Sequence, residues 1–313
     1  MEKETKESFF SIKNVPFYAL ICSVLWGSAF SGVKIGYEKF GIESSDSFSQ
    51  MIFAGSRFAL AGIMAVVIGS IMQKKILLPT KKSLYKIGII GLFQTILQYV
   101  FYYIGLAHTT GVKAAINVSM NVFMALFISA LIFKFEKITS RKIIGTLLGF
   151  GGILIINSSG LTGGFTFTGD GFILLSSVAN GFSSAFMKKF SKDENPVMLT
   201  GWQFFFGGIV MCIAGFAGGG KLSKVSPSAI GILVYLAFVS AVAYSLWSAL
   251  LKYNPVSKVS VYGFMNPICG VILSTIFLGE KGVFGIKGLV ALLFVSAGIY
   301  IVNIKVDNKN NSC

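Results

Sequence analysis

Charged side chains are scarce in this chain of 313 residues. Asp, Glu, Lys and Arg together make up 12% of it, about half of the roughly 25% that is usual in a soluble domain. There is a single histidine, and the four cysteines lack the CxxC spacing of metal or redox sites. The GxxxxGK(S/T) motif of nucleotide-binding P-loops is also missing. We therefore expect no metal, no cofactor and no catalytic residue, and ATP-driven work would require another subunit.

Apolar residues fill the space that charges leave, at 54% of the chain. A run of about 17 to 25 apolar residues is long enough to cross a bilayer as a helix. Such runs occur at residues 16–37, 49–72, 84–107, 112–133, 141–158, 170–190, 196–217, 227–250, 256–278 and 284–304. The sequence thus predicts an all-α integral membrane protein with ten transmembrane helices.

Proline placement supports several of these boundaries. Proline is tolerated in the first turn of a helix, where its missing N–H has no partner in any case. In three places a residue suited to cap a helix comes just before it. These dipeptides are Asn195-Pro196, Ser226-Pro227 and Asn254-Pro255.

The net charge of +15 would suggest nucleic acid as a partner in a soluble protein. In a membrane protein, lysine and arginine are instead concentrated on the cytoplasmic side. Of the 27 such residues, 19 lie on the side of the predicted bundle that holds both termini, and 7 lie on the opposite side. We therefore predict a multi-pass protein of the plasma or inner membrane with both termini in the cytoplasm, and the lipid bilayer rather than nucleic acid as its partner.

A polar stripe occurs twice on otherwise apolar predicted helices. Its members are four residues apart, so they stack along one helical face. The first copy is Lys113, Asn117 and Asn121, and the second, 145 positions later, is Lys258, Tyr262 and Asn266. A repeat of five helices has an odd number of spans, so the second copy must be inverted. Inverted repeats are a recurrent construction of secondary transporters, which bind substrate near the midplane between them.

The repeat divides the chain into five parts. They are a cytoplasmic segment at 1–15, a first five-helix repeat at 16–158, an extracytoplasmic linker at 159–169, a second five-helix repeat at 170–304 and a cytoplasmic tail at 305–313.

Several motifs occur in order and at matched spacing over residues 16–304. They are Leu25-Trp26-Gly27-Ser28-Ala29-Phe30 followed by Lys34, then Arg57-Phe58, then Glu136 and Glu280 before the last helix of each repeat, and a glycine-rich segment ending at Gly152. In these features the chain resembles the ten-helix EamA-type proteins of the drug/metabolite transporter superfamily. The resemblance implies a basket-like bundle in which helices 1–4 and 6–9 surround a central cavity, while helices 5 and 10 pack outside it.

Arg57 is the one ionised residue about two turns inside a predicted span. Such a charge costs at least ~2.5 kcal/mol unless it is paired or hydrated. No Asp or Glu is predicted deep in a span, so its partner is a backbone carbonyl, a rim acid such as Asp46, or a ligand carboxylate. Both helix packing and substrate contact account for it, and the resemblance favours packing.

Buried amides and aromatic rings supply the remaining candidates. Asn121 and Asn266 lie near mid-span, where they can bond neighbouring helices or line a cavity; Pro267 favours the cavity, because it frees a backbone carbonyl beside Asn266. The tryptophans and tyrosines can form a cavity wall, pack the bundle or lie at the membrane interface. The candidate substrate-binding residues are Trp26, Arg57, Gln98, Tyr99, Tyr102, Asn117, Asn121, Asn180, Gln203, Tyr244, Trp247, Tyr262 and Asn266. Lys34, Lys113, Lys188 and Lys258 are candidates for the cavity mouths, and they can also snorkel to the interface.

These features predict a secondary transporter of small metabolites, such as amino acids or amphipathic compounds, that acts by alternating access as a monomer or homodimer. The resemblance implies export. Because no membrane-embedded carboxylate is predicted, an uncoupled facilitator or a channel is an alternative to proton antiport. An integral membrane enzyme is a further alternative, but His108 has no acid near it in sequence to form a catalytic pair.

Overall fold

The computed structural model describes most of the chain, and the described part is helical, without a strand. The described residues are 10–43, 45–108, 117–157, 165–266, 268–269, 272–273 and 286–304. The helical elements are α2 (Val15–Phe40), α3 (Ser47–Met72), α4 (Lys81–Gly91), η1 (Leu92–Leu97), α5 (Gln98–Ala107), α7 (Asn121–Phe127), η2 (Ile128–Ile132), α8 (Ser140–Asn157), η4 (Phe167–Gly171), α9 (Phe172–Phe190), α10 (Pro196–Ala217), α11 (Pro227–Tyr253), α12 (Val256–Ser260), η5 (Val261–Phe264) and α14 (Ile286–Asn303). Of these, η1, η2 and η4 are π-helical and η5 is a 3₁₀-helix.

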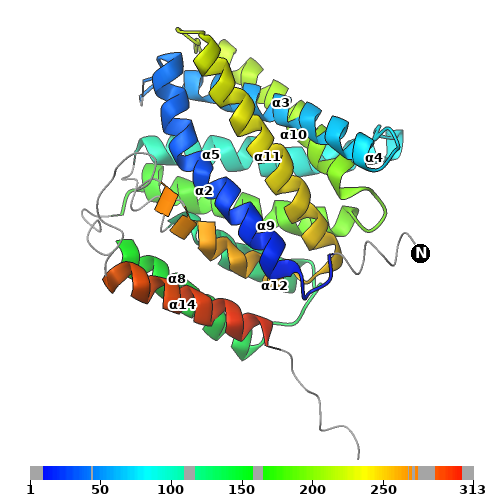
Figure 1. Cartoon of the computed structure of the whole chain (residues 1–313), viewed down its shortest axis with the longest axis vertical. Helices are drawn as coiled ribbons and strands as arrows, with labels where there is room; N and C mark the ends of the chain where they lie inside the picture. The colour runs from blue at the N-terminus through cyan, green and yellow to red at the C-terminus, as the bar shows by residue number, and fades with distance from the viewer. Residues whose placement is uncertain are drawn as a thin grey trace, which may run out of the picture.

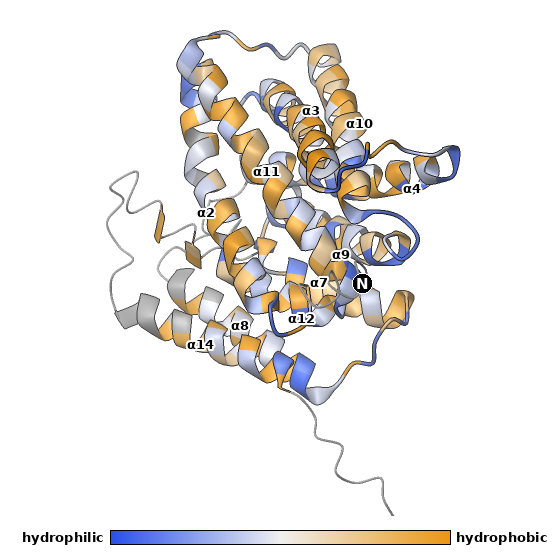
Figure 2. Ribbon diagram, turned by 45° about the vertical axis from the view of Figure 1, so that its right-hand side comes forward, coloured by the Kyte–Doolittle hydropathy of each residue, from blue (hydrophilic) through white to orange (hydrophobic). Residues whose placement is uncertain are grey.

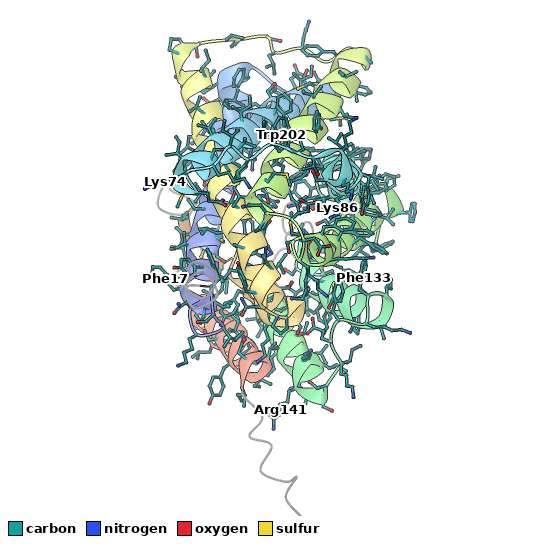
Figure 3. The ribbon with its side chains drawn as sticks, turned by 90° about the vertical axis from the view of Figure 1, so that its right-hand side faces the viewer. Phe17, Lys74, Lys86, Phe133, Arg141 and Trp202 are labelled. Atoms are coloured by element: carbon teal, nitrogen blue, oxygen red, sulfur yellow. The ribbon has the colours of Figure 1, made fainter. Side chains whose placement is uncertain are left out.

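Within this described part, five helical segments are long and apolar enough to cross a membrane. They are Val15–Phe40, Ser47–Met72, Lys81–Gly105, Pro196–Ala217 and Pro227–Tyr253. The outward-facing side chains on these helices are large and apolar, as lipid contact requires. Phe17, for example, is 64% exposed and points away from the bundle (Figure 3). In Figure 2 the hydrophilic residues gather at loops and helix ends. The membrane character predicted from composition is therefore confirmed, whereas ten spans remain a prediction.

The helix starts follow the capping pattern in two of the three predicted cases. Asn195 accepts the backbone N–H of Val197 at 2.9 Å, and the Ser226 hydroxyl accepts that of Ala229 at 3.2 Å. The prediction for Asn254 was wrong. Its side-chain amide donates back to the carbonyl of Leu250 at 2.9 Å, so it closes the end of α11 rather than opening α12.

Glycines allow α3 and α10 to pack backbone against backbone. A Cβ added to Gly62 would lie 2.5 Å from the carbonyl oxygen of Gly201, and one added to Gly55 would lie 2.6 Å from that of Gly208. Figure 1 shows these two helices side by side at one end of the bundle. Small residues at such positions are the usual means by which membrane helices approach closely.

A second glycine contact joins α8 and α14 at the opposite end of the bundle. A Cβ on Gly145 would lie 2.7 Å from the carbonyl oxygen of Gly298, and the two helices form a pair at the edge of the fold (Figure 1). Between the two glycine contacts, α2 packs along α11, and α9 packs against α5 and α7. The region enclosed by α2, α3, α5, α9 and α11 contains most of the predicted site residues.

Candidate functional site

Arg57 lies at the centre of this region, on α3, with only 5% of its surface exposed. Its Nε and Nη2 donate to the hydroxyl of Ser240 on α11 at 3.0 and 2.9 Å. The guanidinium carbon lies 5.0 Å from the centre of the Phe58 ring. Asp46, the predicted rim acid, instead caps the start of α3 by accepting the N–H of Ser49 at 2.9 Å.

The charge of Arg57 is therefore not neutralised by an acid within the described residues. Ser240 offers only a neutral oxygen, and its own hydroxyl proton is donated to the carbonyl of Leu236 at 3.0 Å. An ionised arginine in a span costs about 2.5 to 3.5 kcal/mol in insertion measurements. The cation–π contact offsets part of this cost, by about 0.5 to 2 kcal/mol. The site thus holds a buried positive charge that an anion would stabilise.

Five tyrosines belong to the cluster next to Arg57. The hydroxyls of Tyr99 on α5 and Tyr244 on α11 share a hydrogen bond of 2.9 Å. The cluster around Phe58 includes Tyr103 and Tyr244, and Tyr37, Tyr99 and Tyr102 pack against it. The sequence singled out three of these five; Tyr37 and Tyr103 carried no motif that would have marked them.

Tyr99 and Tyr102 pack against the cluster that contains Phe58, yet each keeps part of its surface accessible. Trp26 of α2 closes the same cluster: its ring meets those of Tyr244 and Trp247 edge to face, each with centroids 5.1 Å apart. Side chains that are enclosed but not fully packed are what a small ligand requires.

Amide side chains form a polar edge beside the rings. The Asn180 amide on α9 donates to Gln98 at 3.3 Å, and Gln203 accepts from the Thr95 hydroxyl at 2.6 Å. The structure therefore brings together most of the predicted residues of helices α2, α3, α5, α9, α10 and α11. They are Trp26, Arg57, Gln98, Tyr99, Tyr102, Asn180, Gln203, Tyr244 and Trp247.

Two donors of this cluster are buried without a partner within the described residues. They are the indole nitrogen of Trp26 and the amide nitrogen of Gln203, and Gln203 has no exposed surface at all. An unpaired buried group costs about 1 to 3 kcal/mol, so a ligand that reached these atoms and accepted their hydrogen bonds would remove that cost.

The polar stripes lie apart from this cluster as far as their contacts are described. Asn117 donates to Asp170 at 3.0 Å, while Tyr262 is buried in an apolar cluster around Phe264. Asn121 and Asn266 keep partly exposed side chains at the start of α7 and after η5. Lys113 and Pro267 lie outside the described residues, so the full stripes remain a prediction.

Two of the four cavity-mouth lysines can be placed. Lys188 donates to the carbonyls of Leu251 and Asn254 at 3.1 and 2.5 Å and so closes the end of α11. Lys258 is partly exposed on α12. The side chains of Lys34 and Lys113 lie outside the described part.

Asp170 is a residue that the sequence reading did not identify. It lies at the outer end of a predicted span, yet only 3% of it is exposed. Its carboxylate accepts from the Asn117 amide and from the backbone N–H of Thr166 at 2.9 Å. An acidic residue in the first turn of a helix is the local signal that could have marked it.

Comparisons with known proteins identify the family of the chain. The model of the EamA-like transporter family matches residues 14–158 and 167–304. The chain belongs to this family.

Its relatives in the EamA-like family come from bacteria and archaea. The uncharacterized transporter YvbV of Bacillus subtilis is 26% identical over 258 residues, covering 82% of this chain and 83% of YvbV. An uncharacterized transporter of Archaeoglobus fulgidus is 28% identical over 288 residues, covering 88% and 94% of the two chains. The uncharacterized inner membrane transporter YedA of Escherichia coli is 26% identical over 264 residues, covering 82% and 80%. A solved crystal structure with 15% identity has a TM-score of 0.75 and covers 93% of this chain and 96% of its own, which shows the fold.

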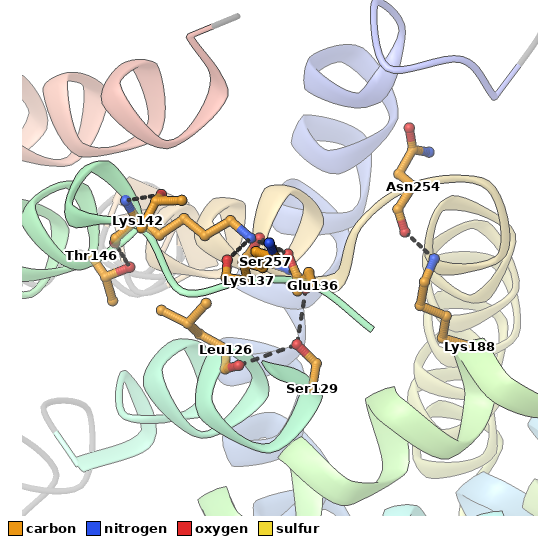
Figure 4. A network of polar contacts seen from close by, with 10 residues as sticks. Leu126, Ser129, Glu136, Lys137, Lys142, Thr146, Lys188, Asn254 and Ser257 are labelled. Carbon is orange, nitrogen blue, oxygen red and sulfur yellow. Dashed lines mark hydrogen bonds and ion pairs between the residues drawn. The ribbon is translucent and has the colours of Figure 1, made fainter. Parts of the chain in front are cut away.

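This EamA-family chain has a second polar network, outside the spans, around Glu136 (Figure 4). The carboxylate accepts the backbone N–H of Ser257 at 3.0 Å, accepts both the Ser129 and Ser257 hydroxyls, and pairs with Lys142 at 2.6 Å. Burial on its own raises the pKa of Glu136, but the hydrogen bonds from Lys142 and Ser257 outweigh it and the pKa is lowered. Glu136 is therefore ionised at neutral pH and ties the segment before α8 to the start of α12.

Proposed function

We propose that this membrane protein is a secondary transporter that moves a small metabolite by alternating access, with the Arg57 cluster as its substrate site. The observation that supports this most directly is the set of donors around Arg57, enclosed by apolar helices. Ordinary packing would leave neither an uncompensated charge nor unpaired amide and indole nitrogens in the interior. A transporter benefits from both, because they are satisfied only when substrate is present.

Contacts between equivalent positions support an inverted repeat. Tyr99 and Tyr244 are 145 positions apart, the same offset as the polar stripes, and they bond each other. α3 and α10, the second helices of the two predicted repeats, pack on each other. So do α8 and α14, the fifth helices. α2, the first helix of the first repeat, packs on α11, the third helix of the second repeat. In the same way α9, the first helix of the second repeat, packs on α5, which belongs to the third helix of the first. A two-fold axis in the membrane plane would produce this pattern.

The Glu136 network is the closure that must open on the proposed cytoplasmic face. Glu136 belongs to the first proposed repeat and Ser257 to the second, so their bonds cross between halves. The bond from Lys188 to Asn254 lies on the same side (Figure 4). In a rocking motion, the bonds between Glu136 and Ser257 would part as the cavity opens inward, and reform as it opens outward.

Export of amino acids or amphipathic compounds is the direction and substrate class that we propose. An uncoupled facilitator is the second candidate, because the Arg57 cluster has no carboxylate within the described residues to carry a proton. Asp170 is buried but lies at the outer end of α9, away from Arg57 and bonded to Asn117.

Counterflow in proteoliposomes tests the proposal. Purified protein is first screened by thermal shift against amino acids and common metabolites, because a ligand that binds the folded state raises its melting temperature. Each hit is then assayed for uptake driven by internal unlabelled compound. Gln98→Ala should weaken binding and flux, and Gln73→Ala, an equivalent change outside the cluster, should leave both unchanged. Saturable counterflow is expected; flux that never saturates would indicate a channel, and no flux would refute a transporter.

A further inference from the structure

We infer that Arg57 receives the carboxylate of the substrate, and that the substrate is a small monocarboxylate with an apolar or aromatic body. The inference rests on the proposed function and specifies the chemistry of its site. It follows from the charge, the unpaired donors and the rings that surround one another in the described part of the chain.

The guanidinium of Arg57 gives the site a positive charge. Two of its nitrogens bond Ser240, while Nη1 makes no hydrogen bond within the described residues. None of the acids in that part of the chain pairs with it. An arginine with a free edge and no counterion in a low-dielectric site selects for a planar anion that it can bond along that edge.

Two unpaired donors also belong to this cluster, the indole nitrogen of Trp26 and the amide nitrogen of Gln203. An anion accepts hydrogen bonds from such donors, whereas an ammonium group cannot. A carboxylate has two oxygens and about four lone pairs, so it can bond Arg57 and a further donor at once. A substrate ammonium group would find no carboxylate within the described part of this cluster. Among the proposed substrates, the site therefore favours those that carry a carboxylate over amines.

Aromatic side chains offer a surface for the body of the substrate. Trp26, Tyr99 and Tyr102 pack against the cluster that contains Phe58, Trp247 lies beside Trp26, and each of the four keeps accessible surface. Rings of this kind stack well on another ring or on an aliphatic body. An aryl or branched aliphatic carboxylate therefore suits this cluster.

The test compares three compounds that share one body. The probes are 3-phenylpropionate, its amide, and 3-phenylpropylamine, added to the purified full-length protein in nanodiscs and followed by thermal shift and titration calorimetry. We expect 3-phenylpropionate to stabilise the wild-type protein, and the amide and the amine to bind at least tenfold more weakly. Equal binding of acid and amide would overturn the inference, as would binding of none of the three. This comparison uses only the wild-type protein, so its result does not depend on whether a variant folds.

Variants then locate the anion. Arg57→Gln should lose the preference for the acid over the amide, and Arg57→Lys should keep part of it. Lys75→Gln removes one exposed charge elsewhere and should leave the preference unchanged. A preference for the acid that persists in Arg57→Gln would place the anion at another site and overturn the inference.

Failure of this inference and failure of the proposed function give different results. If 3-phenylpropionate binds through Arg57 but shows no counterflow in proteoliposomes, the carboxylate site stands and the transport proposal fails. If saturable counterflow is found only for amines or neutral solutes and survives in Arg57→Gln, transport stands and the carboxylate site fails.

Discussion

Replacing Glu136 by glutamine should destabilise the protein through one buried network. The carboxylate serves four donors: the Ser129 hydroxyl, the Lys142 ammonium, and the backbone N–H and hydroxyl of Ser257. Glutamine offers a single oxygen to them and turns its own amide donors toward the rest. The change therefore removes a charge and also places the amide N–H groups of glutamine next to other hydrogen-bond donors.

The size of the effect follows from burial. The side chains of Glu136 and Lys142 are only 8% and 13% exposed, so solvent screens the pair weakly. A hydrogen bond to a charged group is worth about 1.5 to 3 kcal/mol, and breaking a buried pair costs about 3 to 5 kcal/mol. Because the network lies at the edge of the bundle, we expect a loss near the lower end, about 3 kcal/mol in the free energy of unfolding.

Reversible unfolding in mixed micelles measures this loss, and a double-mutant cycle with Lys142→Met isolates the ionic part. The stabilisation should also depend on pH. The folded-state pKa of Glu136 is lowered, so its stabilising effect is complete above the ordinary carboxyl pKa of about 4.3 and is lost as pH falls through the lowered value. The difference between wild type and Glu136→Gln should shrink there. A loss below about 0.5 kcal/mol at pH 7, or one independent of pH, would refute the network.

Two further predictions concern helix packing and capping. Gly62→Ala should unfold or aggregate the protein, because its Cβ would lie 2.5 Å from the carbonyl oxygen of Gly201; Gly88→Ala, with nothing within 4 Å, should instead stabilise α4 by about 0.5 to 1 kcal/mol. Fluorescence-detected size exclusion of the two variants measures this, and similar profiles would contradict the packing. Asp46→Ala should cost about 1 kcal/mol at pH 7 in the same unfolding assay. Hydrogen bonds from Ser49 lower the pKa of Asp46, so its effect is complete above the ordinary carboxyl pKa and disappears as pH falls through the lowered one; an equal effect at pH 3 would contradict the cap.

Local features were predicted well because their partners are neighbours in sequence. Asn195 and Ser226 cap the helices that they immediately precede, and five of the ten apolar runs are found as helical segments long enough to span a membrane. Asn254 has the same local pattern, but its side-chain amide donates to the carbonyl of Leu250 in the preceding turn and does not cap α12. The sequence does not decide between these two hydrogen bonds, because the outcome depends on how α11 ends.

The candidate site was predicted in its residue types but not in its contacts. Trp26, Tyr99 and Tyr244 were named as candidates, but nothing in the sequence showed that the two tyrosines bond each other. Ser240 carried no signal: it is one serine among several on α11, and its contact with Arg57 depends on how α3 and α11 are rotated. Asp170 was missed because its depth is set by the segment before α9.

The bond between Arg57 and Ser240 also has a consequence for synthesis. The two residues are 183 positions apart, and a ribosome adds about 5 to 20 residues each second. Roughly 10 to 40 s therefore pass between the emergence of Arg57 and that of its partner. During this interval the guanidinium of Arg57 lacks the hydroxyl that it bonds in the folded protein, so α3 reaches its final hydrogen bonding only after α11 has been made.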